Sequence, residues 1–405
     1  MPPRSSILAR SALIAATAAL ALPLRAQQSS LELRGGAAAP SGTIVGCSAE
    51  GVTVMSSLTG EITIGWERVR SVSGEHADAA SAFMDVADKA WRATSRLERG
   101  DIAAAEPLLE ELFADYAGQQ GPTASAVCGG LLRCRLERGA HTLAVGAWLA
   151  WLHTQDGGPR TAPEAGTGTS PTTDEETGLA PELPPIWLGL PAVRVFSQTP
   201  LNADQYGDRA AQLALLYQHA AMLESGTPQP MPRLEGNDPG VRMVWEIVAA
   251  RSPVETERLS GRRAIEKRLK SEPVGWTDAW LRTALGRSLL REPDADEQRR
   301  GVIELLRVRV EHERDAPYLA GLALAEAAVT MRTLGDDAAA SLLRRELLDI
   351  FPGHPASTWE PVSRWAAASG RGPGDPEPRR LTHRRLPAMS AESRPESEQS
   401  RSPHG

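Results

Sequence analysis

The sequence is poor in cysteine. It has three cysteines in 405 residues, Cys47, Cys128 and Cys134, which are too few for the disulfide framework of a small secreted domain. Cys128 and Cys134 lie six residues apart on one expected helix, so roughly 9 Å of helix axis separates them, farther than a disulfide reaches. A bridge from Cys47 stays open, because it lies in a different element. We expect the three cysteines to be small, buried side chains.

Apolar runs long enough to cross a membrane, which takes about 20 residues, are also missing. The apolar run SALIAATAALALPL (11–24) follows Arg4 and Arg10 and is followed by the small residue Ala26. A positive start, a short apolar run and a small residue are typical of a secretory signal peptide. We therefore expect cleavage before Gln27, export to the periplasm or the extracellular space, and no integral membrane span in the mature chain.

Basic residues are fewer than acidic residues. The chain has 44 basic and 51 acidic residues, for a net charge of −7. Cleavage would remove three arginines and take the net charge to −10. Because nucleic-acid binding depends on clustered cations, no nucleic-acid partner is expected.

Motifs of catalysis and cofactor binding are absent from the sequence. It contains no G-x-S-x-G, no P-loop and no dinucleotide fingerprint. The eight histidines are scattered, and none has a partner at zinc spacing. His312 falls in a run typical of a charged helical face, and His354 falls in an interhelix turn where packing or capping is expected. We expect no catalytic residue, no metal and no cofactor, and predict that the chain is not an enzyme.

A short β module follows an N-terminal spacer (27–42). Within residues 43–75, β-branched runs at 43–48, 52–55 and 62–66 are separated by the turn-like AEG and SLTG. A module this short cannot build an independent core. We expect it to pack on the following helices or on another chain.

The phrase LERG occurs at 97–100 and again at 136–139, and the residues after the two copies align without a gap. Each copy follows an expected helix and precedes a second one, with a small inner residue at Ala105 or Ala144. A helix, a Gly turn and a second helix form an αα-hairpin. Repetition of this unit suggests a stack of hairpins.

Residues 323–356 carry the same pattern most clearly, with a Gly335-Asp336 turn and a closing Pro352. Together with Trp91 and the turn at Gly100, these features make the chain resemble tetratricopeptide-type repeats. The resemblance covers 78–153 and 276–369. It implies a mainly α fold of αα-hairpin (TPR-like) solenoid blocks, with a small N-terminal antiparallel β module.

The rest of the chain divides by composition. Residues 154–183 have almost no large apolar side chain and are expected to be a disordered linker. The apolar, proline-rich stretch that follows predicts an ordered strap. The expected segments are a signal peptide (1–26), a spacer (27–42), a β module (43–75), a helical block (77–153), a linker (154–183), a strap with a connecting helix (184–235), a second helical block (236–369) and a disordered tail (370–405).

Two tryptophan pairs have helical spacing: Trp148 with Trp151, and Trp276 with Trp280. Such pairs usually fill a core. In a solenoid they can instead line a concave groove, where tryptophan anchors a bound peptide. These four residues are the candidate partner-binding site.

We therefore expect an exported helical-repeat scaffold that binds a protein or peptide partner in the periplasm or cell envelope. Two alternatives stay open. One is an enzyme of unrecognised type with its pocket between the helical blocks. The other is a structural component of an envelope assembly that associates through the β module.

Overall fold

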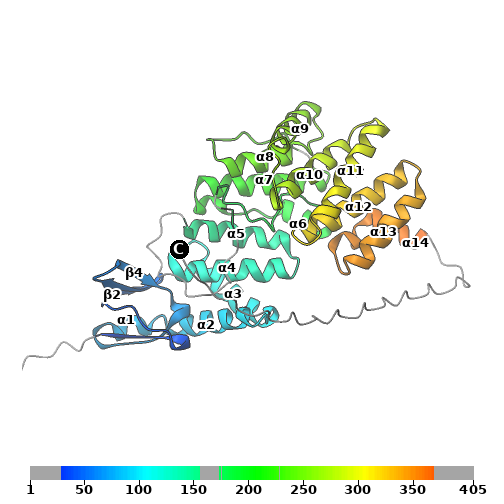
Figure 1. Ribbon diagram of the computed structural model, residues 1–405. Coiled ribbons are helices and arrows are strands. Elements are labelled where there is room, and N and C mark those ends of the chain that lie inside the picture. The colour runs from blue at the N-terminus through cyan, green and yellow to red at the C-terminus, as the bar shows by residue number, and fades with distance from the viewer. Residues whose placement is uncertain (1–28, 156–172, 175, 228, 369–405) are drawn as a thin grey trace, which may run out of the picture. The chain divides into compact units, whose positions relative to one another are not determined.

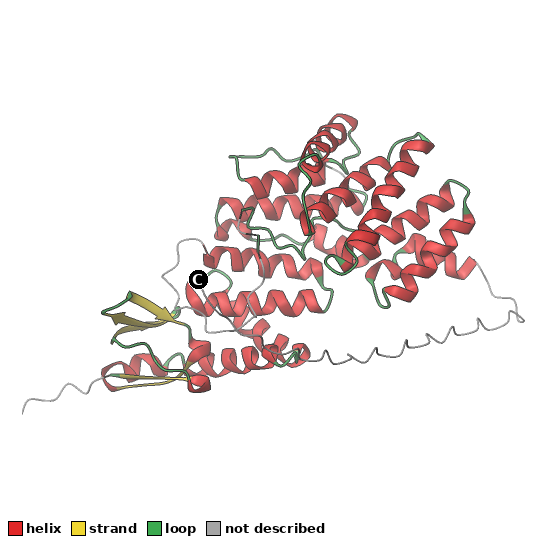
Figure 2. Ribbon diagram, viewed as in Figure 1, coloured by secondary structure: helices red, strands yellow, loops and turns green. Residues whose placement is uncertain are grey.

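The structure is a computed structural model, and it describes residues 29–155, 173–174, 176–227 and 229–368 (Figure 1). The expected signal peptide and the expected tail from residue 370 lie outside the described residues. The chain up to Arg364 forms one unit, which is described below. It is mainly helical, with a small antiparallel β region at its N-terminal end (Figure 2).

Five short strands make up the β region. β1 (Ser30–Leu33) pairs antiparallel with β5 (Val69–Ser73). β2 (Thr43–Ser48), β3 (Gly51–Ser56) and β4 (Gly60–Ile64) form an antiparallel sheet in that order. These three lie close to the expected strand positions. The expected spacer over 27–42 contains a strand that was not predicted, β1, where Leu31 and Leu33 alternate with polar residues and Leu33 is buried.

Trp66 joins the β region to the helices. Its fully buried ring stacks on Phe83 with the ring centroids 5.1 Å apart, and its Nε1 donates to the carbonyl of Ser48. Its backbone N–H donates to Oγ1 of Thr123, in a following helix. The β region thus packs on the helices of its own chain, which was the first of the two expected arrangements.

Fourteen α-helices lie within the described residues. From residue 236 onward the sequence predicts helices near 239–251, 254–271, 276–291, 296–312, 316–334, 337–350 and 357–369, and all seven are present within a few residues of these bounds. Consecutive helices pack on each other through α2–α5 and through α10–α13. The helices are α1 (Ala77–Ser81), α2 (Met84–Glu98), α3 (Ile102–Tyr116), α4 (Gly121–Glu137), α5 (His141–Gln155), α6 (Pro191–Gln198), α7 (Asp208–Glu224), α8 (Pro239–Ala249), α9 (Glu255–Leu269), α10 (Trp276–Leu289), α11 (Ala295–Glu311), α12 (Pro317–Thr333), α13 (Asp337–Ile350) and α14 (Glu360–Ala368).

The two LERG phrases end their helices in the same way. Gly100 and Gly139 have φ values of +74° and +69°, the left-handed conformation expected of a glycine that ends a helix. After each glycine, a backbone N–H bonds to the carbonyl five residues earlier, and the arginine just before the phrase reaches forward to a carbonyl of the next helix. These bonds join Asp101 to Arg96 (2.9 Å), Ala140 to Arg135 (2.7 Å), Arg96 to Ala104 (2.7 Å) and Arg135 to Leu143 (2.8 Å).

The segment 154–183 is ordered at both ends, so the prediction of a disordered linker is wrong there. α5 continues to Gln155, and Leu179 and Leu183 are fully buried. These two leucines are few in number, but both enter the core, which offsets the entropy of ordering the chain around them. Residues 156–172 and 175 lie outside the described residues.

The expected strap at 184–196 is ordered, but its second half is the helix α6. Pro191 stands in the first turn of that helix, where its missing N–H costs nothing. None of the helices within the described residues is long and apolar enough to cross a membrane.

Candidate functional site

The four candidate tryptophans lie in or against the core. Trp148 and Trp280 are 0% exposed and Trp151 is 7% exposed, so these three fill the core and offer no surface to a partner. Trp276 is half-buried and packs edge-on against Trp280, with the ring centroids 4.8 Å apart. Trp280 does bind a non-helical segment, because its Nε1 donates to the carbonyl of Pro181 at 3.0 Å. That segment belongs to this chain.

We call residues 179–190 the inner strap. Its large side chains are at most 2% exposed at Leu179, Leu183, Ile186, Trp187 and Leu188. Its backbone carbonyls are satisfied by side chains of the surrounding helices, as buried carbonyls require. The donors are Trp280 to Pro181, Tyr217 to Leu183, Tyr318 to Ile186 and Arg287 to Trp187.

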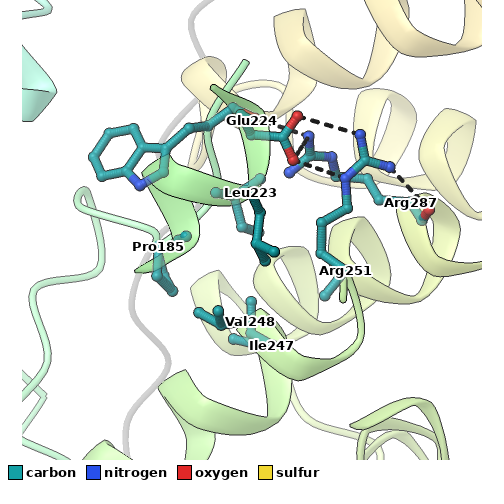
Figure 3. Close-up of a pocket in the computed structure, with 11 residues that line it drawn as sticks. Pro185, Leu223, Glu224, Ile247, Val248, Arg251 and Arg287 are labelled. Atoms are coloured by element: carbon teal, nitrogen blue, oxygen red, sulfur yellow. Dashed lines mark hydrogen bonds and ion pairs between the residues drawn. The ribbon is translucent and has the colours of Figure 1, made fainter. Parts of the chain in front are cut away.

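A cluster of four charged side chains lies beside the inner strap, and Figure 3 draws Glu224, Arg251 and Arg287 of this cluster. Glu224 of α7 faces Arg251, which follows α8, and Arg287 of α10, as the dashed lines in Figure 3 mark. Arg287 Nη2 lies 2.8 Å from Oε1 of Glu326 in α12, and Arg251 Nε lies 2.8 Å from Oε1 of Glu224. Two carboxylates and two guanidinium groups balance each other and join four helical segments.

The electrostatics of this cluster are those of a closed ion network. Burial would raise the pKa of Glu224, but Arg251 and Arg287 outweigh it and lower that pKa to about 2. Burial and the nearby Arg251 lower the pKa of the neighbouring Arg291 to about 10. The cavity beside the cluster has a volume of about 10 Å³, which is room for about one water molecule. An organic substrate does not fit there, so we assign the cluster a structural role.

His312 does not lie on a solvated charged face, so that prediction is wrong. The residue is 7% exposed, and its Nε2 lies 2.7 Å from Oδ2 of Asp278. An oxygen of Glu311 lies within 4.8 Å of both groups. Arg282 Nε donates to the same Asp278 oxygen at 2.7 Å, and Arg282 Nη1 lies 3.1 Å from Glu304. A guanidinium thus already neutralises these carboxylates.

His354 takes the packing and capping role that the sequence predicts. Its Nδ1 accepts a hydrogen bond from the backbone N–H of Ala356, and its Nε2 lies 3.0 Å from the carbonyl of Tyr318. Its ring also packs near Tyr318, with the centroids 5.7 Å apart.

Residues 229–238 form a second proline-containing segment, which runs past α8 and α9. We call it the outer strap. Side chains of neighbouring helices hold its backbone, as they hold the inner strap. Trp245 Nε1 donates to the carbonyl of Pro232 at 3.0 Å. The other two bonds run from Met231 N–H to Glu257 (3.3 Å) and from Glu235 N–H to Gln212 (3.1 Å).

The outer strap leaves an open groove of about 650 Å³ against α8 and α9, helices that pack on each other (Figure 1). We call it the Trp245 groove. Its lining combines apolar and charged side chains, and Trp245 is half-buried in it. The lining residues are Met231, Pro232, Arg233, Leu234, Glu235, Gly236, Asp238, Val241, Arg242, Trp245, Glu246, Glu257, Ser260 and Ala264.

Three acidic residues of the groove already have partners. Glu246 accepts from Arg268 at 2.5 Å, Asp238 pairs with Arg209 at 2.9 Å, and Glu257 accepts from Ser252 Oγ at 2.6 Å. Arg242, in contrast, has a side chain that is 63% exposed and lies 3.5 Å from its nearest carboxylate oxygen, on Glu246. The groove therefore presents an apolar surface, one indole and the exposed guanidinium of Arg242 to solvent.

The sequence reasoning missed this groove. Trp245 lies in an expected helix, but it is not one of a spaced tryptophan pair, and only the pairs were considered. The available signal was the segment QPMPRLEGNDP (229–239), in which prolines bracket Met231 and Leu234 between two expected helices.

No family model matches the chain, and no curated protein and no solved structure is similar to it.

Proposed function

We propose that the chain is an exported helical scaffold that binds an extended segment of a partner protein in the Trp245 groove. The observation that carries this proposal is the groove itself, about 650 Å³ of open space beside a half-buried tryptophan. Concave, partly apolar surfaces with an aromatic anchor are the common setting for peptide recognition.

The inner strap supports the same proposal from within the molecule. Its backbone is non-helical and proline-rich, and helix side chains such as Trp280 and Tyr318 bind its carbonyls. The Trp245 groove offers an indole beside an open space. The helices of this chain thus already hold one irregular segment through side-chain hydrogen bonds to its backbone.

The scaffold part of the proposal draws on the resemblance to tetratricopeptide-type repeats. Helices α2–α5 and α10–α13 pack consecutively, and the turns at Gly100 and Gly139 have matching hydrogen bonds. Such hairpins provide rigid surfaces for partner binding.

The export part of the proposal draws on the N-terminal sequence alone. Intact mass of the protein recovered from the native host tests it, and we expect a chain that begins at Gln27. A chain that retains residues 1–26 would refute export by cleavage.

The binding proposal is tested by selecting short random peptides on the mature chain and measuring their affinities by fluorescence anisotropy. We expect enrichment of peptides whose binding falls by about tenfold or more in Trp245→Ala, since aromatic anchors dominate such interfaces. The matched control is Trp91→Ala, because Trp91 is also partly exposed but lies on α2. Thermal melts establish that both variants are folded.

If no peptide is enriched, or if the enriched peptides bind Trp245→Ala as tightly as the native chain, the groove is not a peptide site. Equal loss in both tryptophan variants would also contradict the proposal.

A further inference from the structure

We infer that Arg291 and Arg258 bind a small oxyanion of the phosphate or sulfate type, just beyond the C-terminal end of α10. Neither residue lines the Trp245 groove, so this site goes beyond the proposed function and does not depend on it. The inference is carried by a guanidinium group that the surrounding residues leave without a counter-charge.

Arg291 has no partner in the part of the chain that the structure describes. The residue is half-buried, and its Nε is buried without a hydrogen-bond partner. Its side chain forms no ion pair with any described carboxylate, although an ion network lies directly beside it. Buried N–H groups in folded proteins are nearly always paired with protein, water or a bound ion. Arg291 is therefore a cation whose acceptor is missing from the chain itself.

The charges that act most strongly on Arg291 are mainly positive. Three are the guanidinium groups of Arg251, Arg287 and Arg258, and one is the carboxylate of Glu224. Burial and then repulsion from Arg251 lower the pKa of Arg291 to about 10, so its surroundings disfavour its positive charge. Glu224 does not offset this repulsion, because it already pairs with Arg251 and Arg287. A bound anion would.

A count of the charges around Arg291 leaves positive charge in excess. Glu292 and Glu326 both pair with other arginines. Arginines outnumber carboxylates here by five to three: Arg251, Arg258, Arg262, Arg287 and Arg291 against Glu224, Glu292 and Glu326. Glu257, the residue before Arg258 in α9, raises the carboxylates to four. One positive charge then still remains without a counter-charge.

The other acceptors nearby are also occupied. Asp294 caps α11, and ion pairs within α11 engage Asp296 and Glu297. Three backbone carbonyls accept from other arginines of the cluster, at 3.2–3.4 Å: those of Arg287, Ser288 and Ser252, from Arg251, Arg262 and Arg258. None of these acceptors bonds to Arg291.

Arg258 supplies the second guanidinium group of the site. Its side chain is 10% exposed, and its Nε and Nη1 make long bonds, of 3.3 Å to Glu292 and 3.4 Å to the carbonyl of Ser252. A guanidinium group has five N–H donors in one plane, so Arg258 has donors to spare. An oxyanion with several acceptor oxygens can accept from two such groups at once, which favours phosphate or sulfate. Partial burial strengthens these bonds.

The test is calorimetric titration of the mature chain with sodium phosphate at constant ionic strength, together with thermal melts. We expect one saturable site and a melting temperature that rises with phosphate, since the ligand binds the folded chain. Arg291→Gln should weaken phosphate binding by about tenfold or more, because charge-assisted hydrogen bonds are lost. Arg291→Lys, which keeps the charge but not the planar group, should fall in between. The control Arg299→Gln, an exposed change on α11, should leave the affinity unchanged.

Four outcomes would overturn the inference. Arg291→Gln could bind phosphate as tightly as the native chain, or Arg299→Gln could lose as much affinity. Phosphate could raise the melting temperature no more than sodium chloride does, which is general screening by salt. Sodium acetate could bind as tightly as phosphate, so that the site does not select this class of anion. Arg291→Gln could melt several degrees lower without phosphate, which would show that the fold itself uses the guanidinium group. Trp245→Ala should bind phosphate normally, so this test and the peptide test succeed or fail separately.

Discussion

The inner and outer straps are held by the same kind of hydrogen bond, but only the inner strap closes on the helices. In each strap an indole N–H donates to a proline-segment carbonyl at 3.0 Å, from Trp280 to Pro181 and from Trp245 to Pro232. Neither strap belongs to a sheet, and both depend on side chains of flanking helices. The inner strap is nevertheless part of the core, whereas the outer strap leaves a groove open beside it.

The difference follows from apolar content. The inner strap buries five large apolar side chains almost completely, and each contributes roughly 1.5–3 kcal/mol on leaving water. The outer strap has Met231 and Leu234, and both are half-buried. Hydrogen bonds to a strap therefore position it, and the amount of apolar surface decides whether it closes on the helices.

The largest expected effect is on the charge cluster beside the inner strap. Arg287→Leu removes the close partner of the buried Glu326, leaving it only Arg251 at 3.8 Å, and it removes the donor to the Trp187 carbonyl. Removing one partner of a buried ion pair costs about 3–5 kcal/mol. We expect a loss of this size in the free energy of unfolding, measured by urea denaturation.

The matched change beside the outer strap is Arg242→Leu. Its exposed guanidinium lies 3.5 Å from Glu246, so we expect a change within about 0.5 kcal/mol. Equal losses in the two variants would mean that the straps do not differ as described.

Much of the helical part of this fold could be predicted from sequence. Apolar periodicity and the capping Asp and Pro residues predict α8 to α14 within a few residues, because local rules fix helix ends. The first part of the inner strap was missed because Leu179 and Leu183 are isolated large apolar residues at the end of a low-complexity stretch. Their burial depends on helices that come later in the chain, which local patterns do not register.

The second largest effect is expected on acidification. Burial lowers the pKa of His141 to about 4, and it also lowers the pKa values of His219 and His354. In the unfolded chain a histidine titrates near about 6.5. Below that pH the unfolded chain binds protons that the folded chain does not, so stability is complete above pH 6.5 and falls as the pH approaches 4.

His141 links this loss to the inner strap, because its ring packs on Tyr318 with the centroids 4.2 Å apart. Its share should be about 3 kcal/mol at pH 4, and His141→Gln should flatten the pH dependence of the melting temperature over this window. Glu224, with its pKa lowered to about 2, adds a further loss only below about pH 4.5. A melting temperature that stays constant between pH 7 and 4.5 would contradict the burial of these histidines.

A smaller effect is expected from removing one hydrogen bond at each strap. Tyr318→Phe removes the donor to the buried carbonyl of Ile186, which should cost about 1–2 kcal/mol in the free energy of unfolding. Trp245→Phe removes the donor to Pro232, but that carbonyl lies beside an open groove where water can replace the indole. We expect about 0.5 kcal/mol or less from the lost bond. The reverse order would show that the outer strap is the more tightly held.

The candidate site was less predictable than the fold. Trp148 and Trp280 had the spacing of anchor residues, but helical spacing is the same for a core face and a groove face. Whether a face is covered depends on segments distant in sequence, here the inner strap. Trp245 stayed half-buried because the segment over it is too polar to close, and only the packed structure distinguishes the two cases.

The smallest effect is expected at Lys267. Its ammonium group is exposed and has no ion pair among the described residues, so Lys267→Gln removes charge without breaking a contact. The free energy of unfolding should stay within about 0.5 kcal/mol of the native value, measured by the same urea titration as Arg287→Leu. The two variants give the largest and the smallest expected loss. Arg287 holds helices together beside the inner strap, whereas Lys267, near the outer strap, makes no contact that stabilises the fold. A loss above about 1 kcal/mol would mean that Lys267 is held in place by the fold.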